Sequence, residues 1–504
     1  MDEIPDDDDR KMSNNTQWDS YLTFLLSMIG SAVGLGNIWR YPYIVYSNGG
    51  GTFIFVYVIS IFLVAIPFMF LEYSIGVKFN SSVPQIFKSI KNKFEIVGWF
   101  IAIIPFLVLT YYACVIGWDI IYFALSFFKG WGTNTDHFFL QTVLQSTDSL
   151  TGLTYIAFPC LFAILIVWFI VWFISHKDIN AGIGKVNKIM IPLIFLIMGI
   201  IVFYSLTLKG ASFGLIKLFN PNFNEIYSTH IWIAAISQIF FSLSIGEGIL
   251  ITYASYLPKK TNLIKSSFIV TSVNCGFELF TAIGIFSILG FMSTTTGINI
   301  NDLVTQGTGL TFIVFPMILN IMGPVAYLIG PLFFLCIFFA GITSAISFFE
   351  PITKAMEEKF NVKRKKVVTY MCIVGALLTM IFTTGAGSYL LTIFDKILNE
   401  VGLFLITILE SIIFSWFYGI DKLLIVLNKN SKLKIGRWWK VLIKYILPIL
   451  LIFIWINEVI NTFNTSSTKL IINFIITMIF ILLPLMLTLI PSKSSQKIST
   501  LKKP

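Results

Sequence analysis

Long apolar stretches recur along this chain, and they limit its fold more than any other feature. Each is long enough to cross about 30 Å of hydrocarbon as an α-helix. A backbone inside a bilayer must satisfy its own hydrogen bonds, so stretches of this length predict membrane-spanning helices. About twelve such spans are predicted, over residues 20–46, 52–77, 95–128, 153–174, 186–208, 230–257, 263–291, 325–356, 366–384, 388–418, 438–460 and 468–490.

Composition excludes a soluble globule. Hydrophobic residues make up 56% of the chain and charged residues 12%, which is more apolar side chain than a soluble core can bury. The net charge of +10 comes from lysines and arginines in short loops after the even-numbered spans. Because such loops face the cytoplasm, we predict a multi-pass protein of the cell membrane, surrounded by lipid, with both termini cytoplasmic and no nucleic-acid partner.

Three glycines interrupt span 1 within seven residues: Gly30, Gly34 and Gly36. Each costs about 1 kcal/mol relative to alanine in a helix, so the helix should unwind here. Unwound backbone is tolerated at membrane depth only where it is buried in protein or lines a cavity. Its carbonyls would bind a cation, and the amides that open the next half-helix would bind an anionic group. A kinked helix that packs through small residues is the alternative.

A second interruption lies in span 6, at residues 241–248. It comes five spans after the first. Interrupted segments at corresponding positions of two halves indicate an inverted repeat with a binding site near the membrane midplane. We therefore predict an all-α polytopic fold with a five-plus-five inverted repeat and discontinuous helices 1 and 6.

The remaining segments are assigned from their composition. Residues 1–11 carry the acidic run Asp6–Asp9 and resemble a non-native leader. Residues 302–321 are interrupted by glycine and proline and are interpreted as a re-entrant outer lid. The predicted segments are a tail over 1–19, helices 1–5 over 20–208, helices 6–10 over 230–418, helices 11 and 12 over 438–490, and a tail over 491–504.

Four motifs occur in order at matching spans: Gly30–Pro42, Asn48–Gly51, Trp232–Tyr256 and Phe339–Ser344. With these motifs the chain resembles the neurotransmitter:sodium symporters, and among them the prokaryotic amino-acid transporters such as the bacterial leucine transporter. The resemblance covers spans 1–10 almost continuously. It implies a carrier that couples sodium entry to amino-acid uptake by alternating access.

The resemblance implies two sodium sites, consistent with the preference of hard cations for oxygen ligands. The first would also use the substrate carboxylate, so ion and substrate would stabilise each other. Hydrogen bonding between helices is an alternative role for the two hydroxyl groups of the second site. The first site would comprise Ala32, Asn37, Ser242 and Asn274, and the second Gly30, Val33, Ala340, Thr343 and Ser344.

The resemblance also implies an amino-acid site, with the substrate carboxylate held by the amides of Leu35 and Gly36 and by the Tyr112 hydroxyl. Monoamine carriers of the family have an aspartate at the position of Gly34. Glycine there implies that the substrate brings its own carboxylate. The full expected set is Ser31, Ala32, Leu35, Gly36, Val108, Tyr112, Phe241, Ser242, Ser244, Glu247, Ser344 and Phe348.

Two intramembrane acids have distinct expected roles. Glu247 stands where the relatives considered have an apolar residue, and an ionisable group at membrane depth is a functional candidate by default. It either recognises a polar or cationic substrate side chain, titrates during transport, or is a protonated, locally bonded carboxyl without a substrate role. Glu278 matches a carboxylate of prokaryotic members where chloride-dependent relatives have serine, so no chloride requirement is expected.

Gates are expected on both sides of the site. Arg40 and Asp395 match an outer charged pair, and opposite charges within the membrane favour pairing; Tyr112 and Phe241 would form the aromatic lid beneath them. On the inner side Trp18, Tyr256 and Glu358 are present, but Asn15 replaces the usual basic residue. Arg10 or Lys11 could substitute, or the inner side could open more readily.

Other functional classes are disfavoured by the residues themselves. An enzyme would need a catalytic set, yet the three histidines lie toward loops with no acid–base pair or metal set beside them. A channel would need a pore ring rather than two occluding breaks. The remaining alternative is a carrier of another small organic solute, coupled to sodium or protons, on the same architecture. The substrate's identity and the oligomeric state do not follow from the sequence.

Overall fold

The computed structural model describes residues 17–147, 149–258, 260–303 and 307–492. Over these ranges the chain is helical and has no β-strand, apart from two isolated bridges, Gly50 with Pro221 and Ile156 with Thr384. The all-α prediction is confirmed. The leader and Asn15 lie outside the described residues.

The first half of the described chain forms spans 1–5 and short surface helices. The second span is continuous, because a π-helical turn at Ile61–Ala65 joins α3 to α4. The helices are α1 (Tyr21–Ala32), α2 (Leu35–Ser47), α3 (Gly51–Ser60), α4 (Ile66–Phe79), α5 (Val83–Ile90), α6 (Glu95–Ser126), α7 (Thr135–His137), α8 (Phe158–Ser175), α9 (Lys185–Leu206) and α10 (Ala211–Phe219).

The second half supplies the remaining spans. π-Helical turns also link α18 to α20 into one long element, Gly387–Asn428, and α21 to α22 into another, Arg437–Phe463. The helices are α11 (Thr229–Ser242), α12 (Ile249–Ala254), α13 (Leu263–Thr296), α14 (Ile300–Leu303), α15 (Phe315–Ile321), α16 (Ala326–Phe360), α17 (Arg364–Thr379), α18 (Gly387–Asp395), α19 (Leu403–Ile412), α20 (Ile420–Asn428), α21 (Arg437–Val441), α22 (Leu447–Phe463) and α23 (Ser467–Leu489).

Ten helical elements of the described chain are long and apolar enough to cross a membrane, and the bent pair α1 and α2 makes eleven. The remaining predicted span, 230–257, is divided into α11 and α12, and neither part is long enough alone. The two spans that fall short as single helices are therefore the two in which breaks were predicted.

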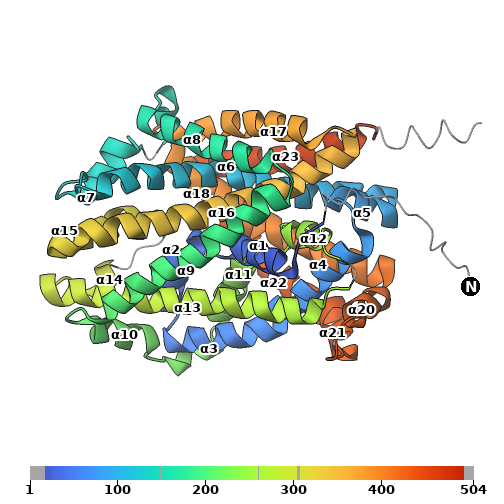
Figure 1. The fold of residues 1–504 in the computed structure, drawn as a ribbon, viewed down its shortest axis with the longest axis horizontal. Helices are drawn as coiled ribbons and strands as arrows, with labels where there is room; N and C mark the ends of the chain where they lie inside the picture. The colour runs from blue at the N-terminus through green and yellow to red at the C-terminus, as the bar shows by residue number, and fades with distance from the viewer. Residues whose placement is uncertain (1–16, 148, 259, 304–306, 493–504) are drawn as a thin grey trace, which may run out of the picture.

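The broken spans lie inside the bundle. The long helices α6 and α16 pack against each other at its centre, and α1 packs against α16 (Figure 1). In the most apolar stretch of the span that contains α6, 89% is buried inside the protein, whereas in the corresponding stretch of α23 only 28% is buried. Exposed phenylalanines on outer helices, such as Phe162 on α8 and Phe203 on α9, form a surface suited to lipid.

The two ends of the bundle carry different elements. In Figure 1, α5, α20 and α21 lie at the right-hand end and α7, α10, α14 and α15 at the left-hand end. Following the predicted orientation, we call the first the inner end and the second the outer end. In the predicted lid, α15 follows a π-helical turn from which Phe312 packs against Trp39 and Tyr122, with ring centroids 6.4 and 5.0 Å apart.

Candidate functional site

The break in span 1 is short and sharply bent. Only Val33 and Gly34 separate α1 from α2, and the two helices are bent by 51°. The Gly34 amide donates to the side-chain oxygen of Asn37 at 3.1 Å, and the Leu35 amide donates to the Tyr112 hydroxyl at 3.3 Å. The C-terminal end of α1, with its negative dipole, and the positive N-terminal end of α2 therefore meet at this point.

The break in span 6 is longer. Residues 243–248 separate α11 from α12, and left-handed φ angles occur at Ser244 (+53°), Gly246 (+81°) and Gly248 (+69°). The Gly246 amide donates to the Glu72 carboxylate of α4 at 2.8 Å. Glu72 is an ionisable residue within a membrane span, and such residues are functional candidates by their position alone. The structure shows it holding the unwound backbone.

The four half-helices pack crosswise. The inner half α1 contacts α12, and the outer half α2 contacts α11. Chain order therefore reverses between the two broken spans, because the first half of one lies beside the second half of the other. This antiparallel arrangement is the one that an inverted repeat requires.

Three of the four residues predicted for the first sodium site, Asn37, Asn274 and Ser242, are joined by hydrogen bonds. The Asn37 amide donates to Asn274 at 2.8 Å, and the Asn274 amide donates to the Ser242 hydroxyl at 2.5 Å. All three side chains are buried. Side chains from α2, α13 and α11 thus form one hydrogen-bonded chain of oxygen-bearing groups beside the break in span 1.

Glu278 lies beside this chain, one helical turn after Asn274. It accepts hydrogen bonds from the Tyr57 hydroxyl and from the Gln238 amide, the latter at 2.7 Å. The carboxylate is fully buried, and no ion pair joins it to a basic side chain of the described residues.

Of the residues predicted for the second sodium site, Gly30 lies on α1 and Val33 in the break that follows it. The other three, Ala340, Thr343 and Ser344, lie on α16, which packs against α1. The Thr343 hydroxyl donates to the backbone of its own helix, at 3.0 Å to Phe339 and 3.1 Å to Ala340. The Ser344 hydroxyl is buried and has no hydrogen-bond partner among the described residues. Thr343 is thus satisfied within its helix, whereas Ser344 offers a free oxygen toward span 1.

A cavity of about 280 Å³ lies beside the break in span 1, near the lower end of small-molecule pockets, about 300 Å³. Its lining includes eight of the predicted substrate and gate residues. Ser31, Ala32, Ser242, Ser244, Glu247 and Ser344 are buried but do not line it. The predicted residues that line it are Leu35, Gly36, Arg40, Val108, Tyr112, Phe241, Phe348 and Asp395.

Aromatic rings form the walls of this cavity. Tyr112 and Phe348 meet edge to face with centroids 5.4 Å apart. Phe241 lies so close to Gly36 that an added Cβ would be 2.2 Å from the ring. Glycine at position 36 therefore allows the ring to lie against the start of α2.

The predicted outer pair is not formed in this conformation. The Arg40 guanidinium lies 4.5 Å above the centre of the Phe241 ring, and within the described residues it makes no ion pair with Asp395. Asp395 instead accepts hydrogen bonds from the Tyr111 hydroxyl at 2.7 Å and the Asn399 amide at 2.9 Å. Both charges line the same cavity, so direct pairing remains a prediction for a more closed state.

Three aromatic residues close the inner end, and we call Trp18, Tyr253 and Tyr256 the inner seal. The Trp18 indole donates to the Tyr253 carbonyl at 2.9 Å, and its amide donates to the Tyr256 carbonyl at 3.1 Å. All three are buried. The neighbouring Asp19 pairs with Lys188 at 2.8 Å, and this hydrogen bond lowers the pKa of the Asp19 carboxyl.

Glu358, predicted with these residues, contacts another element. It accepts hydrogen bonds from the Ser81 hydroxyl at 2.7 Å and the Ser82 amide at 2.8 Å, at the start of α5. The acid beside the seal is Glu350, which accepts from Tyr256 at 2.8 Å and pairs with Arg364 through both oxygens. Sequence analysis missed this pair, because the two residues lie on separate helices, α16 and α17.

Glu247 occupies the break in span 6, between Gly246 and Gly248. It is 2% exposed, and its Oε2 atom has no hydrogen-bond partner among the described residues. No basic side chain of the described chain pairs with it. Burying a polar oxygen without a partner costs about 1–3 kcal/mol, so the arrangement favours a group that supplies a hydrogen bond.

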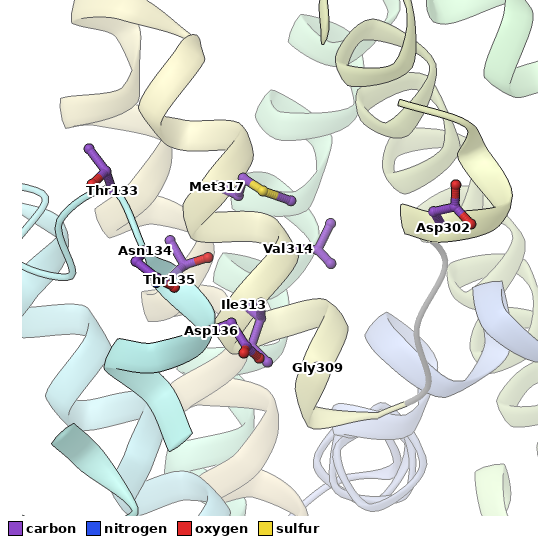
Figure 2. A pocket seen from close by; sticks show the side chains of 9 residues that line it. All are labelled: Thr133, Asn134, Thr135, Asp136, Asp302, Gly309, Ile313, Val314 and Met317. Atoms are coloured by element: carbon purple, nitrogen blue, oxygen red, sulfur yellow. The ribbon is translucent and has the colours of Figure 1, made fainter. Parts of the chain in front are cut away.

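A larger cavity, about 460 Å³, lies away from all of these residues at the outer end. Figure 2 shows Thr133, Asn134 and Asp136, at the start of α7, on one side, Met317 and its neighbours on the helix beside them, and Asp302 on the far side. It contains none of the residues at the breaks. Size alone does not make it the functional site.

Comparison with known proteins agrees with this architecture. The model of the Sodium:neurotransmitter symporter family matches residues 15–136 and 129–500. An uncharacterised sodium-dependent transporter of Methanocaldococcus jannaschii is 40% identical over 434 residues, which are 86% of this chain and 88% of that protein.

Two animal relatives are more distant. A sodium- and chloride-dependent GABA transporter of Drosophila melanogaster is 29% identical over 90% of this chain and 53% of its own length. Sodium-dependent nutrient amino acid transporter 1 of Drosophila grimshawi is 27% identical over 89% of this chain and 77% of its own. All three relatives are named as sodium-dependent, and the names of the two animal proteins give different substrates. On the family match and the archaeal relative, this chain belongs to the sodium:neurotransmitter symporter family.

Proposed function

We propose that this protein is a sodium-coupled symporter that takes up an amino acid by alternating access. The observation that carries the proposal is the break in span 1, where the negative end of α1 and the positive end of α2 meet beside a cavity of about 280 Å³. Carbonyls at the first end suit sodium, and amides at the second suit a carboxylate. One substrate molecule could contact both.

The substrate, sodium and the protein would be joined in one network of hydrogen bonds and sodium–oxygen contacts. The carboxylate would accept from the amides of Leu35 and Gly36 and from the Tyr112 hydroxyl, and its second oxygen would ligate the sodium held by Asn37 and Asn274. Sodium would therefore raise substrate affinity directly. We place the protein in the cell membrane with both termini in the cytoplasm, from its loop charges.

Sodium-dependent binding of an amino acid is the test of this function. Purified protein is titrated with each of the twenty amino acids in sodium and in potassium buffer. We expect one group of amino acids to bind in sodium and to lose at least about 30-fold in affinity in potassium, about 2 kcal/mol of coupling. Equal binding in both buffers, or binding of a solute without a carboxylate in preference, would contradict the proposal and favour another type of carrier.

We propose that the substrate side chain is polar or cationic and reaches Glu247, which lies outside the cavity lining in this conformation. Its unpartnered Oε2 atom is buried in the span 6 break. Glu72, the acid that holds this break, also has one buried oxygen without a partner among the described residues. An incoming ammonium or amide would supply the missing hydrogen bond and, if cationic, would offset buried negative charge.

Replacing Glu247 by glutamine is expected to change substrate ranking. Affinity for the preferred cationic or polar amino acid should fall at least about tenfold, the usual scale for a lost charged hydrogen bond of about 1.5–3 kcal/mol. Affinity for small apolar amino acids should stay within threefold of its value in the unchanged protein, and this serves as the internal control. An unchanged ranking and pH profile would reduce Glu247 to a structural carboxyl.

A further inference from the structure

A buried lysine lies at the inner end, outside the proposed substrate and sodium sites. Lys354 is on α16 and is 5% exposed. Within the described residues it makes no ion pair, and its ammonium contacts the end of α12 instead. We infer that Lys354 is a latch whose ammonium holds the end of α12 against α16 and so keeps the inner seal closed.

The ammonium makes two contacts with the end of α12. It donates a hydrogen bond to the Ser255 hydroxyl, which in turn donates to the Thr252 carbonyl at 2.5 Å. It also lies 4.3 Å above the centre of the Tyr256 ring. Such a contact between a cation and an aromatic ring is strongest when water is excluded. The ammonium thus contacts the seal residue Tyr256 directly, and through Ser255 it is linked to the Thr252 carbonyl near the end of this half-helix.

The opposite side of the same segment contacts Trp18. The Trp18 amide and indole donate to the carbonyls of Tyr256 and Tyr253, and the Tyr253 hydroxyl donates to Ser347 of α16 at 2.9 Å. The end of α12 therefore lies between Trp18 and α16. A path from the cytoplasm to the break can open here only if this segment separates from one of them.

The acids nearest in sequence to Lys354 on α16 already have other partners. Glu350 binds Arg364 through both oxygens, Glu357 lies 3.9 Å from the same guanidinium, and Glu358 accepts a hydrogen bond from Ser81. If the end of α12 moved away, Lys354 would lose both of its contacts. Only the longer-range electrostatic attraction of these acids would remain. The specific partners of Lys354 therefore belong to the closed arrangement, which is the basis for a latch.

The latch rests on the proposed alternating access but is tested without transport. Full-length Lys354→Met protein in lipid nanodiscs, without sodium, is compared with the unchanged chain by hydrogen–deuterium exchange. We expect at least threefold faster exchange in peptides covering residues 17–26 and 249–258, because the seal opens more often. Apparent sodium affinity should fall three- to tenfold. Lys354→Arg, which keeps the charge, should lie closer to the unchanged chain.

Lys359 supplies a matched control on the same helix. It is also buried, at 6% exposure, but it pairs with Glu95 of α6 at 2.7 Å and lies 5.3 Å above the Trp99 ring of the same helix. Lys359→Met should leave exchange at the inner seal unchanged. Equal acceleration in this control, or unchanged or slower exchange in Lys354→Met, would overturn the latch.

Ser255→Ala gives an independent test that keeps the lysine. It removes the acceptor on α12 and should accelerate exchange in the same two peptides. Added to Lys354→Met, it should change exchange by less than 1.5-fold, because the shared contact is already lost. Independent, multiplying effects would contradict the inference. If no amino acid binds in sodium, the proposed function fails while these exchange results still decide the latch.

Discussion

Replacing Gly34 by aspartate is expected to abolish amino-acid binding, with affinity at least about 100-fold weaker, or about 2.7 kcal/mol. Gly34 has φ −119° and ψ −168°, an extended conformation that any residue can adopt. Space is what requires glycine: an added Cβ would lie 2.8 Å from the Ser344 hydroxyl oxygen and 3.3 Å from the Tyr112 hydroxyl oxygen. An aspartate carboxylate would compete for the donors proposed to bind the substrate carboxylate.

Gly34→Asn is the matched control, because its side chain has nearly the same size without the charge. Both variants are measured by equilibrium binding in saturating sodium, with thermal unfolding to confirm folding. The aspartate variant should bind at least about tenfold more weakly than the asparagine variant, since two carboxylates repel strongly in a site of low dielectric constant. Equal losses would mean that only steric crowding matters, and retained binding in both would remove the carboxylate subsite from this position.

Replacing Glu278 by serine is expected to make transport require chloride. The unchanged protein should work equally in chloride and gluconate, because the buried carboxylate already supplies a negative charge beside Asn274 and Ser242. In the variant, the Tyr57 hydroxyl and Gln238 amide lose their acceptor, and leaving a buried donor unpaired costs about 1–3 kcal/mol. We expect at least about a tenfold loss of activity in gluconate, restored by chloride, which would accept from both donors.

The control for this experiment is Glu278→Gln. It removes the charge but fills the same volume, so it leaves no room for an anion and should lose activity without chloride rescue. Uptake into proteoliposomes is measured in sodium with chloride or gluconate as the anion. Chloride dependence of the unchanged protein, as in the name of the Drosophila GABA transporter, would show that Glu278 does not replace the anion.

Much of this fold could be predicted from local sequence. Apolar stretches located most spans closely: the stretch 95–128 is α6, Glu95–Ser126, and the stretch 263–291 begins α13 at Leu263. The element predicted over 388–418 continues to Asn428. The breaks could be located because glycines disfavour a helix wherever they stand. Neither property depends on distant residues, so a single sequence suffices for both.

The partners of the outer-gate charges could not be predicted from local sequence. Opposite charges at Arg40 and Asp395 favoured pairing, yet Arg40 lies over Phe241 and Asp395 accepts from Tyr111. Which partner a half-buried charge takes depends on distances across several helices and on the conformation of the whole bundle. The sequence shows which charges are present but not which of the available partners is within reach.

Other partnerships were also decided by packing. Glu72 reaches the amide of Gly246, 174 positions away, and Lys354 reaches Ser255, 99 positions away. The inner pair Glu350 and Arg364 is closer in sequence but lies on two helices. Such pairs have no periodic or compositional signature, and only the composition of the membrane interior marks their members as unusual.

The sequence by itself determined that this chain spans a membrane as helices and where two of those helices are interrupted. It also determined which residues with side-chain oxygens lie near the interruptions. The physical reason is that hydrophobic transfer and helix propensity act residue by residue. Only the tertiary structure decided which side chains hold the breaks, which aromatic rings close each end, and which cation contacts the inner seal. Those outcomes depend on short-range contacts between helices, whose energies vanish unless the whole bundle brings the atoms together.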